Sequence, residues 1–169
     1  MGQKTDPTQP RGTEETEPAI GYDPELGFDH GLLYEAYGLW RTLGGEDRLP
    51  ALADVDPLNL PKKMLPHIQL LDIEPGVVPR LRWRLIGTHV TRALGRDATG
   101  LYWDELYEPE ALETLRRGVD WVRERRQPIR CIGTASFADK AYQHFETIEM
   151  PLSDDQETVD AVWMVTVYS

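Results

Sequence analysis

Cysteine is almost missing from this chain, which has one, Cys131, among its 169 residues. A single cysteine forms neither an internal disulfide nor a multi-cysteine metal site, so the class of small disulfide-stabilised secreted domains is excluded. The sequence also has no run of about 18 apolar residues, the length that a membrane-spanning helix needs. The first residues lack the apolar core of a signal peptide, and we therefore expect a cytoplasmic protein with no membrane contact.

Basic residues are scarce as well, with 18 Lys and Arg against 29 Asp and Glu and a formal net charge of -11. Such a charge repels phosphate backbones and anionic membranes, so nucleic acid is not expected as a partner. Motifs of common enzyme classes are absent: the sequence has no G-x-S-x-G elbow, no phosphate-binding loop and no H-E-x-x-H. These absences favour a non-catalytic protein.

The distribution of apolar residues divides the chain into two parts. Residues 1–28 are rich in proline and acidic side chains and poor in apolar ones, which predicts a disordered acidic tail. Residues 29–169 are long enough for one domain. It begins with a helix over 29–44, for which Asp29 is a plausible N-cap and Gly44 the end. This helix, which carries Trp40, is expected to cover part of the core, and a dimer contact is the alternative.

A connector rich in proline follows the helix. Its two aspartates, Asp54 and Asp56, have no acidic or histidine partner close by, and we assign them to turns rather than to a metal site. Residues 68–74 and 80–88 then alternate apolar and charged side chains and are separated by Pro75-Gly76, which predicts an antiparallel hairpin. Its charged face is expected to pair Asp72 and Glu74 with arginines 80, 82 and 84, and an anion site is the alternative.

The second half of the domain alternates short helices with strands. Gly95 and Gly100 end a short helix that starts after Gly87, and an aromatic-rich helical piece follows over 101–107. Pro109 and terminal arginines mark a longer helix over 108–126. Three strands close the chain, over 129–137, 142–151 and 158–168. The last is apolar on both sides, so we expect it in the centre of the sheet, covered on both faces.

This order predicts an α+β fold: one five-stranded antiparallel sheet with helices on one face, preceded by the N-terminal helix. In this order and in several motifs the chain resembles the PAS superfamily, and more specifically a PAS-like family common in alphaproteobacteria. The resemblance covers about residues 30–168. Its motifs are the helix with Trp40, the connector with Asp56-Pro57, Leu65-Pro66, Arg84-Leu85-Ile86-Gly87-Thr88, Gly95-Arg96-Asp97 and Thr99-Gly100.

The resemblance implies a sensory or interaction module that holds a small molecule, or nothing, between the sheet and its helices. No output domain accompanies it here, so a protein partner or a second copy of the chain would receive the signal. The residues that we expect around such a cavity are Trp83, Leu85, His89, Leu94, Trp103 and Leu115. Trp103 is also compatible with a purely structural place in the core.

The sequence does not identify a cofactor. A flavin adduct needs a reactive cysteine among the helices, and Cys131 falls in a predicted strand instead. A haem needs an axial ligand, for which His89 is the one candidate, although a solvated or locally bonded His89 is the favoured interpretation. The alternative function is a small α+β enzyme or ligand carrier, which predicts a pocket lined by at least two titratable groups.

Overall fold

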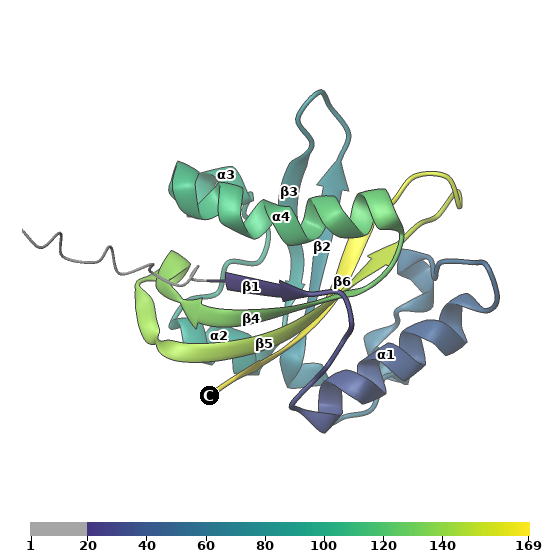
Figure 1. Cartoon of the computed structure of the whole chain (residues 1–169), viewed down its shortest axis with the longest axis horizontal. Coiled ribbons are helices and arrows are strands. Elements are labelled where there is room, and N and C mark those ends of the chain that lie inside the picture. The colour runs from purple at the N-terminus through teal and green to yellow at the C-terminus, as the bar shows by residue number, and fades with distance from the viewer. Residues whose placement is uncertain (1–19) are drawn as a thin grey trace, which may run out of the picture.

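The computed structural model describes residues 20–169 of the chain. Figure 1 shows their arrangement, with a curved sheet at the centre and helices packed against it. In chain order the elements are β1 (Ile20–Asp23), α1 (Gly31–Gly44), β2 (Ile68–Glu74), β3 (Arg80–Ile86), α2 (Thr88–Leu94), α3 (Trp103–Leu106), α4 (Pro109–Arg125), β4 (Ile129–Ala135), β5 (Lys140–Leu152) and β6 (Ala161–Tyr168). Three single 3-10 turns wrap the connector between α1 and β2.

The strands form one antiparallel sheet in the order β1-β4-β5-β6-β2-β3. This confirms the predicted α+β fold class, and β6 is central, as its apolar sequence indicates. The sheet has six strands rather than five, because β1 adds to the free edge of β4 with Ile20 opposite Gly133. Residues 20–28 therefore do not belong to a disordered tail; residues 1–19 of that predicted tail lie outside the described residues.

The sheet is covered on both faces, by different helices. The helices α2, α3 and α4 pack on one face, where Val119 and Val122 of α4 share a core cluster with Met164. The helix α1 packs on the other, where Leu33 and Ala36 share a second cluster with Trp163. The expectation of helices on one face is confirmed for α2–α4. The N-terminal helix α1, to which the sequence assigned no face, covers the other, because a central strand that is apolar on both sides requires cover on both.

The predicted core-covering role of α1 is confirmed. Its Trp40 side chain packs against both core clusters and donates a hydrogen bond from Nε1 to the carbonyl of Pro151 at 2.9 Å. The predicted cap is wrong: His30 is the N-cap residue, and the Asp29 carboxylate pairs with Arg130 instead, at 3.2 Å. None of the helices in residues 20–169 is both long and apolar enough to cross a membrane.

The β2–β3 hairpin forms as predicted, but only one of its arginines pairs across it. Arg84 binds Asp72 at 2.7 Å, whereas Arg80 makes two 2.8 Å bonds to Asp104 of α3 and lies over the Tyr102 ring. The short helix α3 sits beside β3 and supplies partners that the local sequence does not reveal. Asp54 and Asp56 accept backbone N–H bonds at 2.9 Å in their turns, as expected.

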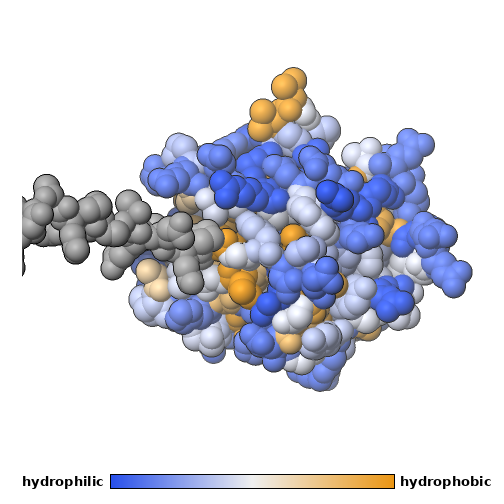
Figure 2. Space-filling view, viewed as in Figure 1, coloured by the Kyte–Doolittle hydropathy of each residue, from blue (hydrophilic) through white to orange (hydrophobic). Residues whose placement is uncertain are grey.

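The turn of this hairpin projects from the molecule and carries an exposed apolar tip, made by Val77 and Val78. Figure 2 shows this tip as an isolated hydrophobic spot at the top of a face that is otherwise mostly hydrophilic. At the other end of the hairpin, Gly87 joins β3 to α2. A Cβ atom there would lie 2.3 Å from the carbonyl oxygen of Pro66, so only glycine fits between the two segments.

Candidate functional site

A cavity of about 60 Å³ lies between the sheet and the helices α2–α4. The sheet forms its floor, and the helices, together with the loops at both ends of α3 and the β4–β5 turn, form its walls. Its lining residues are Ile20, Tyr22, Gln69, Trp83, Ile86, Leu94, Arg96, Ala98, Trp103, Tyr107, Leu115, Cys131, Phe137, Phe145, Thr147, Glu149, Met164, Thr166 and Tyr168. Most of these are apolar or aromatic, as is typical of small-molecule sites.

Aromatic rings form a continuous wall around the cavity. Neighbouring ring centroids are 5.3–6.0 Å apart, the spacing at which aromatic pairs attract one another. The run passes in order through Trp83, Trp103, Tyr107, Phe137, Phe145 and Tyr168. It links β3 and α3 to β5 and β6, so residues from distant parts of the chain define one apolar space.

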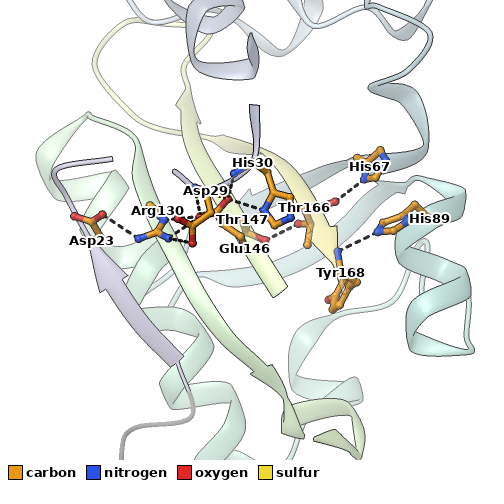
Figure 3. Close-up of polar contacts among 10 residues, drawn as sticks. All are labelled: Asp23, Asp29, His30, His67, His89, Arg130, Glu146, Thr147, Thr166 and Tyr168. Carbon is orange, nitrogen blue, oxygen red and sulfur yellow. Dashed lines mark hydrogen bonds and ion pairs between the residues drawn. The ribbon is translucent and has the colours of Figure 1, made fainter. Parts of the chain in front are cut away.

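The floor of the cavity carries a row of polar side chains across neighbouring strands. Thr166 Oγ1 donates to Gln69 Oε1 at 2.6 Å, and the two hydroxyls of Thr147 and Thr166 lie 2.6 Å apart. Figure 3 shows these two threonines side by side on β5 and β6. Because Thr166 donates to Gln69, Thr147 donates to Thr166, so both hydroxyl protons are used within the row and the row adds no charge to the cavity.

Glu149 is the most unusual residue of the floor. Its side chain lies under α4 and is only 7 % exposed, and burial raises the pKa of its carboxyl group to about 8. A Cβ atom on Gly118 of α4 would lie 2.6 Å from Glu149 Oε2, so the missing side chain of this glycine makes room for the carboxyl group. The neighbouring Cys131 thiol is also buried, which raises its pKa.

Two polar atoms in the cavity wall lack a hydrogen-bond partner among the described residues. They are Glu149 Oε2 and the indole Nε1 of Trp103, whose side chain is 3 % exposed. Leaving a buried donor or acceptor unsatisfied costs roughly 1–3 kcal/mol. A third such atom, Trp163 Nε1, lies in the core on the opposite face of the sheet.

The size of the cavity limits what it holds without rearrangement. One water needs roughly 10–15 Å³ of such space, and an apolar cavity of about 150 Å³ binds benzene. At about 60 Å³, this cavity accommodates a few waters or a short aliphatic group. A flavin or a haem requires the helices α2–α4 to move away from the sheet.

The structure brings four of the six predicted cavity residues together. Trp83, Leu94, Trp103 and Leu115 line the cavity. Leu85 packs against the core cluster on the opposite face. The reason is a register shift in the pairing of β2 with β3: Leu71 lies opposite Trp83, but the preceding residue, Leu70, lies opposite Leu85. The alternation of sides along β3 is therefore interrupted before Leu85.

His89 does not line the cavity, and its ring is held by a hydrogen bond from a distant strand, β6. Its Nε2 accepts the backbone N–H of Tyr168 at 3.0 Å, and its ring packs against His67 with centroids 4.1 Å apart (Figure 3). Burial and the neighbouring His67 and Arg92 lower the pKa of His89, which keeps the ring neutral. The nitrogen that a haem iron would need is thus already occupied by β6.

Sequence patterns do not indicate Glu149 or the threonine row. From Phe145 on, both faces of β5 are buried, so no alternation of polar and apolar residues marks its inward side. The available signal was an acid between two apolar residues, Ile148 and Met150, inside a predicted strand. A carboxyl group buried at such a position either stays ionised and needs a charged or hydrogen-bonding partner, or becomes neutral with a raised pKa. Both cases mark a candidate functional residue.

A separate polar cluster lies on the opposite face and holds the start of α1. Glu146 is buried there and accepts hydrogen bonds from the backbone N–H groups of Asp29 and His30, at 2.9 and 3.0 Å. Arg130 donates to Glu146 at 2.7 Å and also pairs with Asp23, at 3.3 Å (Figure 3). These bonds attach the β1–α1 connection to β4 and β5, which assigns the cluster a structural role.

Comparison with known proteins gives one finding. A family model described as a PAS domain matches residues 29–165. No curated protein and no solved structure matches the chain. The matched stretch runs from the turn before α1 into β6 and includes all the lining residues of the cavity except those of β1 and of the end of β6, which are Ile20, Tyr22, Thr166 and Tyr168. The chain therefore belongs to the PAS domain family.

Proposed function

We propose that this PAS domain is a non-catalytic sensory module that binds a small, mostly apolar molecule in the cavity between its sheet and the helices α2–α4. The observation that carries the proposal is the pair of buried, unpartnered polar atoms in the cavity wall, Trp103 Nε1 and Glu149 Oε2. A ligand that bonds either atom removes an energetic penalty that the empty cavity bears.

A route for the output is supported by the packing of α1. Trp40 contacts both core clusters, so it touches the cavity side and the opposite face of the sheet at once. A ligand that favours one position of the helices α2–α4 can change the position of α1 only if Trp40 packs differently in the ligand-bound and ligand-free states. We propose that α1 presents the signal to a protein partner or to a second copy of the chain.

The test is native mass spectrometry of the full chain purified from its host, compared with the same sample after denaturation. We expect a retained small molecule, present at a lower fraction in Trp103→Phe, which removes the indole N–H from the cavity. Trp163→Phe is the matched control, because it removes an equally buried and unpartnered N–H outside the cavity. A clean apo mass in every sample would contradict ligand sensing and leave signalling by protein contact alone.

A ligand carrier or small enzyme is the second candidate, because the cavity holds two adjacent titratable groups, Glu149 and Cys131. Burial disfavours the charged form of both, so neither is ionised for attack or proton abstraction at neutral pH. The two candidates differ in what happens to the bound molecule. A mass that changes with time in the presence of the protein would favour the enzyme, and a constant mass favours the sensor.

A further inference from the structure

A cationic side chain, Arg96, stands at the mouth of the cavity, although the protein as a whole carries a net charge of -11. Arg96 lies in the loop between α2 and α3, is exposed to solvent and lines the cavity. Within residues 20–169, none of the ion pairs involves Arg96. The carboxylate of the adjacent Asp97 is turned to Thr99, whose N–H and hydroxyl donate to it at 3.0 and 2.6 Å.

A second cation lies close to this mouth. Lys140 Nζ is 3.8 Å from the position that a Cβ atom on Gly95 would take, next to Arg96. The β4–β5 turn thereby brings an ammonium group to the α2–α3 loop. Two cations beside an apolar opening attract an anionic group, and a guanidinium binds a carboxylate in a two-bond fork.

The interior does not oppose an anion. Glu149 is the one acidic side chain of the lining, and with a pKa of about 8 it is mostly uncharged at neutral pH. The indole N–H of Trp103 is a free donor, whereas Thr147 and Thr166 are bonded to each other. The lining therefore offers donors and a cation to a ligand, which favours a molecule with acceptor oxygens over an amine.

The interior also sets the length of the ligand. At roughly 10–15 Å³ for each water, about 60 Å³ holds a few waters, and a tail of a few carbon atoms fills the same space. Taking the sensory function above as its basis, we propose that the ligand is a short monocarboxylate. Its carboxylate pairs with Arg96 at the mouth and accepts the free N–H of Trp103, and its aliphatic tail lies among the aromatic rings of the cavity.

The experiment compares three four-carbon probes that differ in their polar end: butyrate, 1-butanol and butylammonium. Each is titrated into the isotopically labelled full chain, and the amide shifts of cavity residues give a dissociation constant. We expect butyrate to bind most tightly and Arg96→Gln to weaken it about fivefold, the upper range for one solvent-exposed ion pair. Arg92→Gln is the matched control, since Arg92 is an exposed arginine of α2 that does not line the cavity.

The outcomes of this titration separate an error in the ligand class from an error in the sensory function. If butanol or butylammonium binds as tightly as butyrate, or if Arg96→Gln leaves butyrate binding unchanged, the carboxylate assignment is wrong while the cavity remains a ligand site. If none of the three probes binds, the ligand class is wrong. The sensory proposal falls with it only when native mass spectrometry also finds a clean apo protein.

Discussion

Replacing Gly118 by alanine tests whether α4 is in direct contact with the buried carboxyl group of Glu149. A Cβ atom at this position would lie 2.6 Å from Glu149 Oε2 and 2.8 Å from Tyr22 Cε1. Neither neighbour moves easily, because Glu149 is buried and the Tyr22 hydroxyl donates to the carbonyl of Thr114. Gly38 provides a matched control, since it lies inside α1 with no atom within 4 Å of its Cβ position.

Both substitutions gain helix propensity, worth about 1 kcal/mol for alanine over glycine in a helix interior. At Gly38 this gain is unopposed, so we expect the free energy of unfolding to rise by about 1 kcal/mol. At Gly118 the overpacking costs roughly 1–3 kcal/mol, which cancels or exceeds the gain. The two variants should therefore differ by roughly 1–3 kcal/mol, or about 2–12 °C in Tm for a domain of this size.

The assay is thermal unfolding of the full chain and both variants, followed by circular dichroism in the same buffer. Urea titration of the same samples shows whether the difference persists at 25 °C. If Gly118→Ala raises Tm as much as Gly38→Ala does, α4 does not press on Glu149. The close approach of α4 to the carboxyl group of Glu149 in the cavity floor would then be wrong.

Three further perturbations address the fold and the cavity. Glu146→Ala leaves two backbone N–H groups without their acceptor and removes the buried one of the three carboxylates that pair with Arg130, and we expect a loss of about 3 kcal/mol in urea unfolding. Glu35→Ala, which breaks an exposed pair, should cost less than about 1 kcal/mol, and equal losses would contradict the buried cluster. Because the pKa of Glu149 is raised, the folded state keeps a proton that the unfolded chain releases as the pH rises. Between about pH 5 and 8 the free energy of unfolding of the wild type should therefore fall relative to that of Glu149→Gln, by up to roughly 1.4 kcal/mol per pH unit. Parallel curves of stability against pH would refute this. Gly87→Ala should destabilise the protein by about 3 kcal/mol or more, because the added methyl meets backbone oxygens that cannot turn away; wild-type stability by calorimetry would show that the segments separate freely.

Local signals predicted the element order of this chain well. The strand over 68–74 and the helix over 108–126 correspond closely to β2 and α4, because alternation in β2 and Pro109 at the start of α4 are properties of neighbouring residues. The central place of β6 followed from its apolar character on both sides. The PAS resemblance rested on turn residues of this kind, among them Gly87, whose close approach to Pro66 explains why glycine is required there.

Contacts between distant residues decided what the sequence missed. The strand β1 has only four residues, and its pairing with β4 joins segments that lie more than 100 residues apart. The sequence offers His89 as a candidate ligand because it does not reveal that β6 supplies the N–H group that His89 Nε2 accepts. Both outcomes depend on which strand edges and backbone groups come together, and local periodicity carries no information on that.

The sequence by itself determined the fold class, the two-sided burial of the last strand and four of the cavity residues, because hydrophobic periodicity and turn chemistry act over a few neighbouring positions. Only the tertiary structure decided that α1 covers the opposite face, that Glu149 lies under Gly118 and that Arg96 stands at the cavity mouth. The pKa of Glu149 follows from burial by elements that are distant in the chain. The chemistry of the cavity is therefore a property of the assembled fold.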